Sequence, residues 1–285
     1  MDILLTGATG FLGSHLTHAL INEKHKITVL KRKKSNIERI KDVIDKVKYY
    51  NIDDTDLDDV FKNNKYDAVI HTATCYGRHK ESTVEIMRTN DLFPLEVLLK
   101  AVEYNVPKFI NTDTSSEKFL SDYSLAKKHF LDWGEKVSSE RNITFINLCL
   151  EHMYGPNDDP SKFVDYIILN CKKNVKKIDL TEGKQKRDFI YIDDVVAAFL
   201  TVLHTELYGY RSFCVGSGCN ISIRNAVEII HKLLKSKTIL NFGAIPLRKN
   251  EVLESKVDLV PLKSLGWEPK YSFVEGIEKT IKING

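Results

Sequence analysis

The sequence lacks the features that are typical of secreted proteins, membrane proteins and proteins stabilised by a structural metal ion. Its five cysteines are odd in number and scattered, with no Cys-x-x-Cys pair, so neither a disulfide framework nor a zinc site is expected. No apolar run approaches the about 20 residues that a membrane span needs. The chain also enters an apolar strand pattern at once, without a charged leader and cleavage site. These absences predict a cytoplasmic protein with reduced cysteines, no metal and no membrane partner.

A strong net charge is also missing. The formal net charge is only +3. Acids and bases alternate, as in Glu38-Arg39 and Lys41-Asp42, which is typical of a solvated surface. The exception is a basic run at 31–34, whose position gives it another explanation below. No nucleic-acid partner is therefore expected.

Apolar runs and helical patterns alternate along the first part of the chain. Strands are expected at 3–5, 27–30, 47–50, 68–71, 109–111 and 143–148, and helices at 11–20, 37–46, 57–61, 84–104 (interrupted at Pro94) and 123–138. Near-continuous apolar strands that alternate with helices indicate a parallel sheet covered on both faces. We therefore predict an α/β protein whose residues 1–160 form a doubly wound parallel sheet of the Rossmann type.

The alternation loosens from about Gly155. Shorter elements are expected at 163–171, 193–204, 223–234 and 273–283. No internal repeat or low-complexity linker separates the two parts. We expect residues 161–285 to form a smaller C-terminal α/β region, and we leave open that some of its strands and helices return to the first domain.

Three glycines with the spacing Gly7-x-x-Gly10-x-x-Gly13 follow the first strand and open the first helix. In that context backbone amides at the helix N-terminus can face a pyrophosphate, and the glycines allow close approach and close helix packing. A tight structural turn could have the same pattern, but the context favours a dinucleotide site. The expected cofactor contacts in this turn are Gly7, Thr9, Gly10, Phe11, Leu12 and Gly13.

The end of the second strand should lie beside the adenosine ribose of such a cofactor. An acid there would bind a free 2′-hydroxyl, whereas a basic group would bind a 2′-phosphate. The sequence has Lys31 and Arg32 at this point, which favours NADPH (NADP) over NAD. We expect the Arg32 guanidinium to donate two hydrogen bonds to the phosphate. A lysine-rich surface turn would look the same, so NAD remains the alternative. Asn51 and Ile52, at the end of the third strand, should reach the adenine.

Tyr123 and Lys127 lie four residues apart on one face of a predicted helix. A cationic lysine favours the phenolate of a neighbouring tyrosine, so we expect Lys127 to lower the pKa of Tyr123 and fit it for proton transfer. A surface pair would have the same spacing. Thr114, at the end of the strand before this helix, offers a hydroxyl to the same substrate oxygen, and this third group favours a catalytic site.

Together these motifs resemble the extended short-chain dehydrogenase/reductase superfamily, the sugar-nucleotide epimerases, dehydratases and reductases. The resemblance covers nearly the whole chain and includes Gly7-x-x-Gly10-x-x-Gly13, Asp67-Ala-Val-Ile-His71-Thr-Ala73, Asn90, Tyr123-x-x-x-Lys127, Tyr154-Gly155-Pro156, Arg187-Asp188-Phe189-Ile-Tyr191-Ile-Asp193-Asp194, Val215-Gly216-Ser217-Gly218 and Leu265-Gly266-Trp267. It implies a homodimer and a catalytic role for Thr114. The further cofactor contacts that it implies are Thr72, Ala73, Thr74, Asn90, Thr112, Tyr123 and Lys127.

Missing groups narrow the reaction. Dehydratases of this superfamily carry an Asp-Glu pair directly after the catalytic Thr, whereas Ser115 and Ser116 follow Thr114 here. Enzymes that join 3,5-epimerisation to reduction carry a Cys two residues after the catalytic Ser and a His shortly after the Tyr-Gly-Pro turn. Neither is present in this chain. A 4-epimerase usually has the NAD-type turn, which Lys31 and Arg32 disfavour.

The resemblance therefore implies an NADP-dependent oxidoreductase that reduces the C4 ketone of a nucleotide-linked 4-keto-6-deoxyhexose, in deoxysugar biosynthesis for surface polysaccharide. Segments at 74–79, 111–114 and 150–155 are similar to those of CDP-paratose and CDP-abequose synthases, which favours a CDP-linked substrate. The alternatives are an NAD-dependent nucleotide-sugar 4-epimerase and a non-catalytic NADP sensor.

The partner implied by this reaction is a nucleotide-diphosphate sugar. The expected substrate contacts are Tyr76, Arg78, Thr114, Glu151, His152, Arg187 and Arg248. Arg187 and Arg248 are the candidates for phosphate or base contacts. Arg187 would equally serve as a salt bridge to Asp188 or Asp193, and His152 as a satisfied structural residue.

Overall fold

The computed structural model describes residues 1–247 and 252–284. The chain forms two compact units, the first from Met1–Leu150 with Val196–Phe213 and the second from Glu151–Val195 with Cys214–Gly285. The sequence placed the boundary at residue 160, whereas the first unit ends its N-terminal stretch at Leu150, the last residue of a strand. Val196–Phe213 is the part of the C-terminal half that returns to the first unit.

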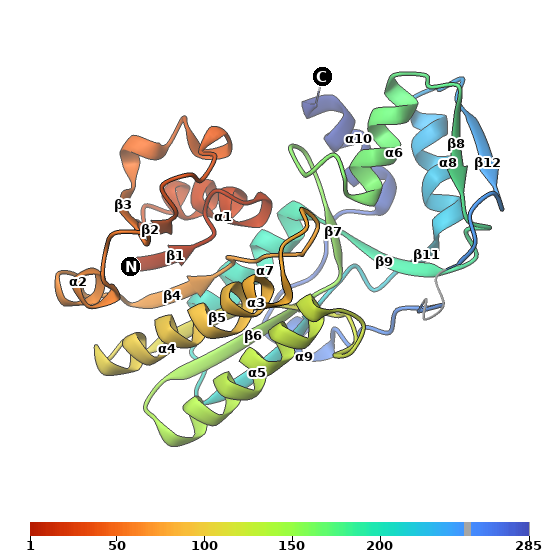
Figure 1. Ribbon diagram of the computed structural model, residues 1–285. Helices are drawn as coiled ribbons and strands as arrows, with labels where there is room; N and C mark the ends of the chain where they lie inside the picture. Colours follow the sequence, from red (N-terminus) through yellow and green to blue (C-terminus); the bar gives the residue numbers. More distant parts are fainter. Residues whose placement is uncertain (248–251, 285) are drawn as a thin grey trace. The chain divides into compact units, whose positions relative to one another are not determined.

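A seven-stranded sheet forms the centre of the first unit, in the order β10-β6-β5-β4-β1-β2-β3 (Figure 1). Its strands are β1 (Asp2–Thr6), β2 (Lys26–Lys31), β3 (Lys48–Asn51), β4 (Ala68–His71), β5 (Lys108–Thr114), β6 (Thr144–Leu150) and β10 (Tyr210–Val215). Pairing is parallel from β3 across to β6, and Leu4 lies opposite Thr28 on one side and Val69 on the other. The strand order reverses beside β1, so the predicted doubly wound Rossmann sheet is confirmed.

Helices flank this sheet. They are α1 (Phe11–Asn22), α2 (Leu57–Lys62), α3 (Thr83–Met87), α4 (Phe93–Glu103), α5 (Asp122–Glu140) and α7 (Ile192–His204), of which the first unit contains the part from Val196 onward. Helix α5 packs on β5 and β6. Across residues 1–247 and 252–284, no helix is both long and apolar enough to cross a membrane.

The close packing of α5 on the sheet depends on one glycine. A Cβ at Gly134 would lie 2.1 Å from the ring of Phe145, so a larger residue there would push the helix away from β6. The Phe145 ring stacks in turn on Phe109, with centroids 5.6 Å apart, and both rings are fully buried. This aromatic layer fixes the height of α5 above the sheet and thereby positions the side chains near its N-terminus.

The helix predicted at 37–46 is wrong. This segment forms two short 3-10 turns, η1 (Glu38–Ile40) and η2 (Ile44–Lys46). Backbone hydrogen bonds three residues apart run from Ile40 to Ile37 and from Val43 to Ile40. The apolar residues are β-branched and spaced by three, which matches the period of a 3-10 turn more closely than that of an α-helix.

The helical region predicted at 84–104 is interrupted, but before Pro94 and not at it. Pro94 lies in the first turn of α4, where its missing N–H is not needed. The irregular segment comes before it, as a π-helical stretch η3 (Arg88–Leu92). This stretch contains Asn90, and π-helical turns are frequent at functional sites.

The second unit contains two small sheets and four helices among its described residues. The sheets have the orders β11-β9-β7 and β12-β8. Their strands are β7 (His152–Tyr154), β8 (Lys177–Leu180), β9 (Lys186–Tyr191), β11 (Asn220–Ser222) and β12 (Ile239–Phe242), and the helices are α6 (Phe163–Lys172), α8 (Ile223–Leu233), α9 (Val260–Lys263) and α10 (Phe273–Ile283). The sequence predicted short elements, of unassigned type, close to α6, α8 and α10, and it missed these short strands.

The glycine turn between β1 and α1 is closely packed. A Cβ at Gly13 would lie 2.1 Å from the carbonyl oxygen of Gly7. Gly7 has a φ of +73°, and a Cβ there would lie 2.5 Å from the backbone nitrogen of Ala73. The two glycines therefore let α1, the end of β1 and the segment after β4 approach one another at backbone distance.

Replacing Gly13 by Ala should destabilise the first unit by about 1–3 kcal/mol, because the new methyl group overlaps the Gly7 carbonyl. The free energy of unfolding in urea measures this loss. Gly10→Ala is the matched control, since a Cβ at Gly10 would meet only the Gly7 carbonyl oxygen, at 3.2 Å, and should cost less than about 1 kcal/mol. Equal losses in both variants would contradict the packing described for Gly13.

Candidate active site

The N-terminus of α1 is suited to bind an anion. Its N-cap residue is Gly10, which supplies no side-chain hydrogen bond, and the first turn contains no acid. By contrast, Ser121 caps α5 and accepts a hydrogen bond from the Ser124 amide. The first amides of α1 are thus left to a group other than a capping side chain, and together with the helix dipole they favour a phosphate.

A buried pair that the sequence analysis did not assign supports this turn from β1 and β4. His71 is fully buried, and its Nδ1 lies 2.8 Å from the Thr6 hydroxyl. The same hydroxyl accepts a hydrogen bond from the Ala73 amide at 3.3 Å. Burial lowers the pKa of His71 well below its usual value, and Lys127 lowers it further. His71 is therefore neutral and acts here as a rigid link between the two strand ends.

The basic residues after β2 differ in their engagement. Lys31 donates a hydrogen bond to the Asn51 side chain at 2.8 Å, so it joins the ends of β2 and β3. The Arg32 side chain makes no hydrogen bond or ion pair with the described residues. Of the two, Arg32 is the one free to bind a further anion.

Asn90 holds the loop after β4. Its amide nitrogen donates to the carbonyls of Cys75 and Ile86, and its oxygen accepts from the Thr74 hydroxyl and the Cys75 amide. The side chain is fully buried. Asn90 thus positions Thr74 and Cys75, and its effect on a cofactor would pass through that loop.

Tyr123, Thr114 and Thr74 come together at the carboxyl ends of β4 and β5. The hydroxyls of Thr114 and Thr74 both act to lower the pKa of the Tyr123 phenol, while they donate their own protons to Ser116 and Asn90. The Tyr76 ring packs on Tyr123 with centroids 5.0 Å apart, and the Arg78 guanidinium lies 4.9 Å above the Tyr76 ring. The first unit therefore brings Tyr76 and Arg78, two predicted substrate contacts, next to the predicted catalytic tyrosine.

The expectation that Lys127 lowers the pKa of Tyr123 is wrong for this site. Burial raises the pKa of Tyr123 well above its usual value, and Tyr76 and Asp113 raise it further, while Thr114 and Thr74 act against them. The cause is desolvation, which the four-residue spacing could not reveal. A phenol in this state keeps its proton and is suited to donate it.

Lys127 is almost completely buried, at 1% exposure. Its Nζ makes no hydrogen bond to any of the described residues. Burial lowers the pKa of Lys127 to about 8, with Asp113 raising it and Lys128 lowering it. The Thr112 hydroxyl, on the neighbouring strand end, likewise has no partner among the described residues. These two groups fit the hydroxyls of a nicotinamide ribose, the moiety that the sequence predicts here.

The counter-charge of Lys127 is Asp113, a residue for which no role was predicted from the sequence. Its side chain is buried, and Oδ2 accepts hydrogen bonds from Lys128 Nζ at 2.6 Å and from Asn147 at 3.3 Å. Asn147 is bonded in turn to Asn111 on β5. An acid near the end of a predicted strand was the available signal, since a buried carboxylate needs partners.

The residues after Thr114 have no acidic function. Ser116 Oγ accepts a hydrogen bond from the Thr114 hydroxyl at 3.1 Å, and the Ser116 amide donates to the same hydroxyl. Ser116 therefore orients the Thr114 hydroxyl. It offers neither the acid nor the base that removal of water would need.

The second unit holds the remaining predicted substrate contacts. Arg187 donates to the carbonyls of Lys186 and Val252 at 2.8 and 2.6 Å, so at least part of its guanidinium serves the backbone. Neither expected salt bridge of Arg187, to Asp188 or to Asp193, is among the described contacts. His152 is exposed, and its Nδ1 lies 3.4 Å from the buried Glu151 carboxylate. Arg248 lies outside the described residues.

A turn with uncapped amides, an arginine after β2 and a buried lysine whose Nζ has no partner among the described residues have the chemistry that a dinucleotide site requires. Residues 3–216 match the NAD dependent epimerase/dehydratase family, and the chain belongs to that family. It is 33% identical to the CDP-abequose synthase of Salmonella typhimurium, over 98% of this chain and 97% of that protein. The CDP-abequose synthase of Salmonella muenchen is 36% identical, over 99% and 97% of the two chains. The predicted family resemblance is thus confirmed.

Solved structures share the fold. The UDP-glucose 4-epimerase of Thermotoga maritima superposes with a TM-score of 0.88 over 99% of this chain and 98% of its own, at 24% identity. The UDP-glucose 4-epimerase of Thermus thermophilus in complex with NAD gives 0.85 over 100% and 99%, at 22% identity. At these identities the likeness establishes the architecture alone.

Replacing Asp113 by Asn should move the pH range in which the site binds a reduced nicotinamide dinucleotide. Asp113 raises the pKa of Lys127, so its neutral replacement lowers that pKa below about 8. The loss of affinity on the alkaline side should then begin about one pH unit lower. Titration of dinucleotide fluorescence between pH 6 and pH 9 covers the pKa of Lys127 in both proteins and measures the change. A shift of one pKa unit corresponds to about 1.4 kcal/mol.

Asp122→Asn is the control for this experiment. Asp122 is exposed at the start of the same helix and accepts its hydrogen bond from Thr83. Its replacement should leave the profile unchanged. An Asp113→Asn profile that coincides with the wild type would contradict the role assigned to the carboxylate.

Proposed function

We propose that this enzyme reduces the C4 ketone of a CDP-linked 4-keto-6-deoxyhexose with NADPH, as a step in deoxysugar biosynthesis for surface polysaccharide. The observation that carries the proposal is the setting of Tyr123, a partly buried phenol that packs against the Tyr76 ring and whose pKa is raised by desolvation, so that it keeps its proton. Identity of 33–36% to CDP-abequose synthases over nearly the whole length supports the nucleotide and the sugar class.

The residues of the chain divide the work of such a reduction. When bound, the reduced nicotinamide supplies hydride to the ketone carbon. Thr114 is held by the Ser116 amide, and its hydroxyl turns its proton from Ser116 Oγ to the ketone oxygen when the substrate binds. Tyr123 donates its proton to the same oxygen as negative charge develops there. Lys127 holds the ribose, and the amides of the glycine turn hold the pyrophosphate.

The preference for NADPH rests on Arg32. Lys31 is hydrogen-bonded to Asn51, whereas the Arg32 guanidinium is available to donate two hydrogen bonds to a 2′-phosphate. The relatives of solved structure that carry NAD in their names share only the fold with this chain. NADP is therefore proposed from the residues of this turn.

Two other functions remain in view. A 4-epimerase would need tightly held NAD and would interconvert isomers without net oxidation, and a putative UDP-glucose 4-epimerase from Methanocaldococcus jannaschii is 26% identical. A non-catalytic NADP sensor would not need a catalytic tyrosine.

We propose that the enzyme acts as a homodimer, as the family resemblance implies.

Incubation with NADPH and CDP-4-keto-6-deoxyglucose should consume the absorbance of the reduced nicotinamide. Tyr123→Phe should lower this rate by about 10²–10⁴-fold, because it removes the proton donor. Tyr208→Phe, at an exposed tyrosine of the same unit, should retain full activity. Isomer interconversion with bound NAD and no loss of absorbance would instead support the epimerase.

Replacing Arg32 by Ala should weaken NADPH binding by about 10–100-fold, the equivalent of a charge-assisted hydrogen bond of about 1.5–3 kcal/mol. NADH binding should change little, since NADH has no 2′-phosphate. Lys34→Ala, in the same basic run, is the control for loss of a positive charge. Equal effects of Arg32→Ala on both cofactors would contradict the proposed phosphate contact.

A further inference from the structure

Two histidines and a glutamate converge at the edge of the first unit opposite the glycine turn. Glu23 Oε2 lies 3.1 Å from His25 Nε2 and 2.8 Å from His204 Nε2. The three ligand-type atoms all lie within 4.8 Å of one another. His204 is 181 positions from Glu23 in the sequence, so no motif could have indicated the cluster.

The first two members are brought together by the way α1 ends. Glu23 is the C-cap, and Lys24 follows in the left-handed conformation with a φ of 63°. The amides of Lys24 and His25 donate to the carbonyls of Ile21 and Leu20, which is the Schellman arrangement. This turn folds the chain back so that the side chains of Glu23 and His25 face each other.

The third member comes from the end of another helix. His204 is the last residue of α7. Two helix C-termini therefore meet at the cluster, and each carries partial negative charge from its last carbonyls. Together with the Glu23 carboxylate, this makes the point favourable for a cation.

We propose that Glu23, His25 and His204 bind a zinc ion, with a fourth position open to water. Imidazole and carboxylate ligands suit Zn²⁺, and three protein ligands with one open position is a common zinc arrangement. Ligand atoms about 2.0–2.2 Å from a tetrahedral ion lie about 3.3–3.5 Å from one another. The present separations of 2.8 and 3.1 Å need only small outward movements to admit the ion.

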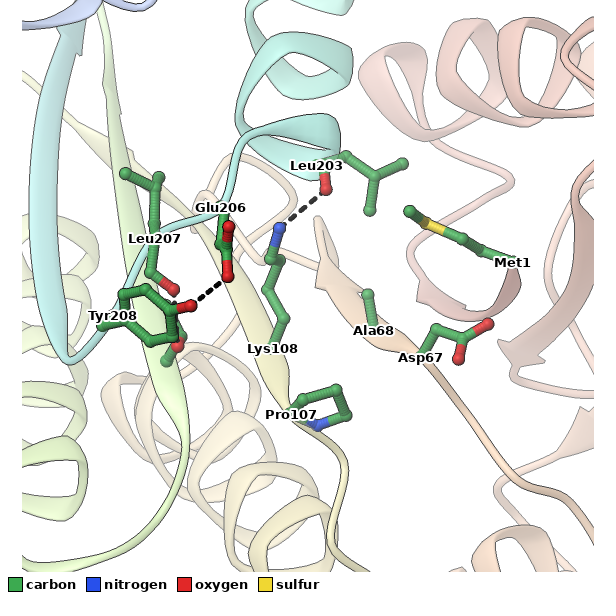
Figure 2. A pocket seen from close by; sticks show the side chains of 10 residues that line it. Met1, Asp67, Ala68, Pro107, Lys108, Leu203, Glu206, Leu207 and Tyr208 are labelled. Carbon is green, nitrogen blue, oxygen red and sulfur yellow. Dashed lines mark hydrogen bonds between the residues drawn. The ribbon is translucent and has the colours of Figure 1, made fainter.

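The surroundings leave these side chains available. His25 Nδ1 lies 3.2 Å from the amino group of Met1, a contact that holds the ring with Nε2 toward Glu23. Binding of zinc at Nε2 would move the ring proton to Nδ1 and release this contact. Lys108 satisfies the carbonyls of Val202, Leu203 and Thr205 at the end of α7. Figure 2 shows Lys108 bonded to Leu203 in the adjoining cavity of about 440 Å³, which Met1 also lines. The side chain of His204 is not used in this capping.

Three protein ligands with an open position is the arrangement of catalytic zinc sites, but this cluster lies away from the catalytic residues, so the ion would act on the stability of the fold. His25 directly precedes β2, whereas the glycine turn and Thr114 follow the carboxyl ends of β1 and β5. A bound ion would join the end of α1 to the end of α7, and it would stabilise the folded chain in proportion to its binding. The inference does not depend on the proposed reaction.

Calorimetric titration of the untagged, chelator-treated protein with ZnCl₂ tests the proposal. One equivalent of Zn²⁺ should bind, and His204→Gln should lower the affinity of that site by at least about tenfold. Removal of a residue that only hydrogen-bonds to a metal ligand already costs this much affinity. His18→Gln is the matched control, because His18 pairs with the single carboxylate of Asp42 and should leave the affinity unchanged.

A second variant and a second ion keep the test decisive. Glu23→Gln should reproduce the loss if His204→Gln folds poorly. Titration with CoCl₂ should give visible bands without the intense near-ultraviolet absorption of a cobalt–thiolate bond, which separates this site from the free cysteines. Absence of Zn²⁺ binding at about 0.1 mM, or equal affinity of wild type, His204→Gln and Glu23→Gln, would overturn the proposal.

Discussion

The first unit depends on one contact between backbones, at the point where β1 ends and α1 begins. Gly13 lies directly against the carbonyl of Gly7, and Gly7 lies directly against the backbone that follows β4. This contact sets the distance between helix and sheet, and it brings the amides of α1 to the carboxyl edge of the strands. His71 and the loop held by Asn90 are built on the same edge, so the amides proposed to hold the pyrophosphate take their position from it.

Burial of charge is the second constraint. Lys127 on α5 and Asp113 on β5 are 1% and 2% exposed, and an ammonium buried there without its counter-charge would be strongly disfavoured. An apolar pair of similar volume would serve stability as well or better. The polar network of Asp113, Lys128, Asn147 and Asn111 is therefore best explained by the chemistry that we propose at Tyr123, which would cost this unit part of its stability.

Local patterns predicted the features that local geometry controls. The glycine turn and the spacing of Tyr123 and Lys127 each depend on a few neighbouring residues, and both lie where the sequence indicated. The sign of the Tyr123 pKa shift did not follow, because it depends on burial and on Asp113 from another element. The place of β10 beside β6 was also missed, since pairing between strands so far apart leaves no periodic signal in either one.

The discontinuous first unit has a consequence for synthesis on the ribosome. Its last strand, β10, emerges only after the segment Glu151–Val195 of the second unit. Between the appearance of β6 and of β10 the nascent chain must elongate by about 60 residues, which takes roughly 3–12 s at about 5–20 residues per second. During that interval the apolar strand β6 is an open sheet edge, able to pair with other chains. Protein yield in the cell should therefore depend on chaperones that shield nascent chains, even though the finished fold leaves this strand paired on both sides.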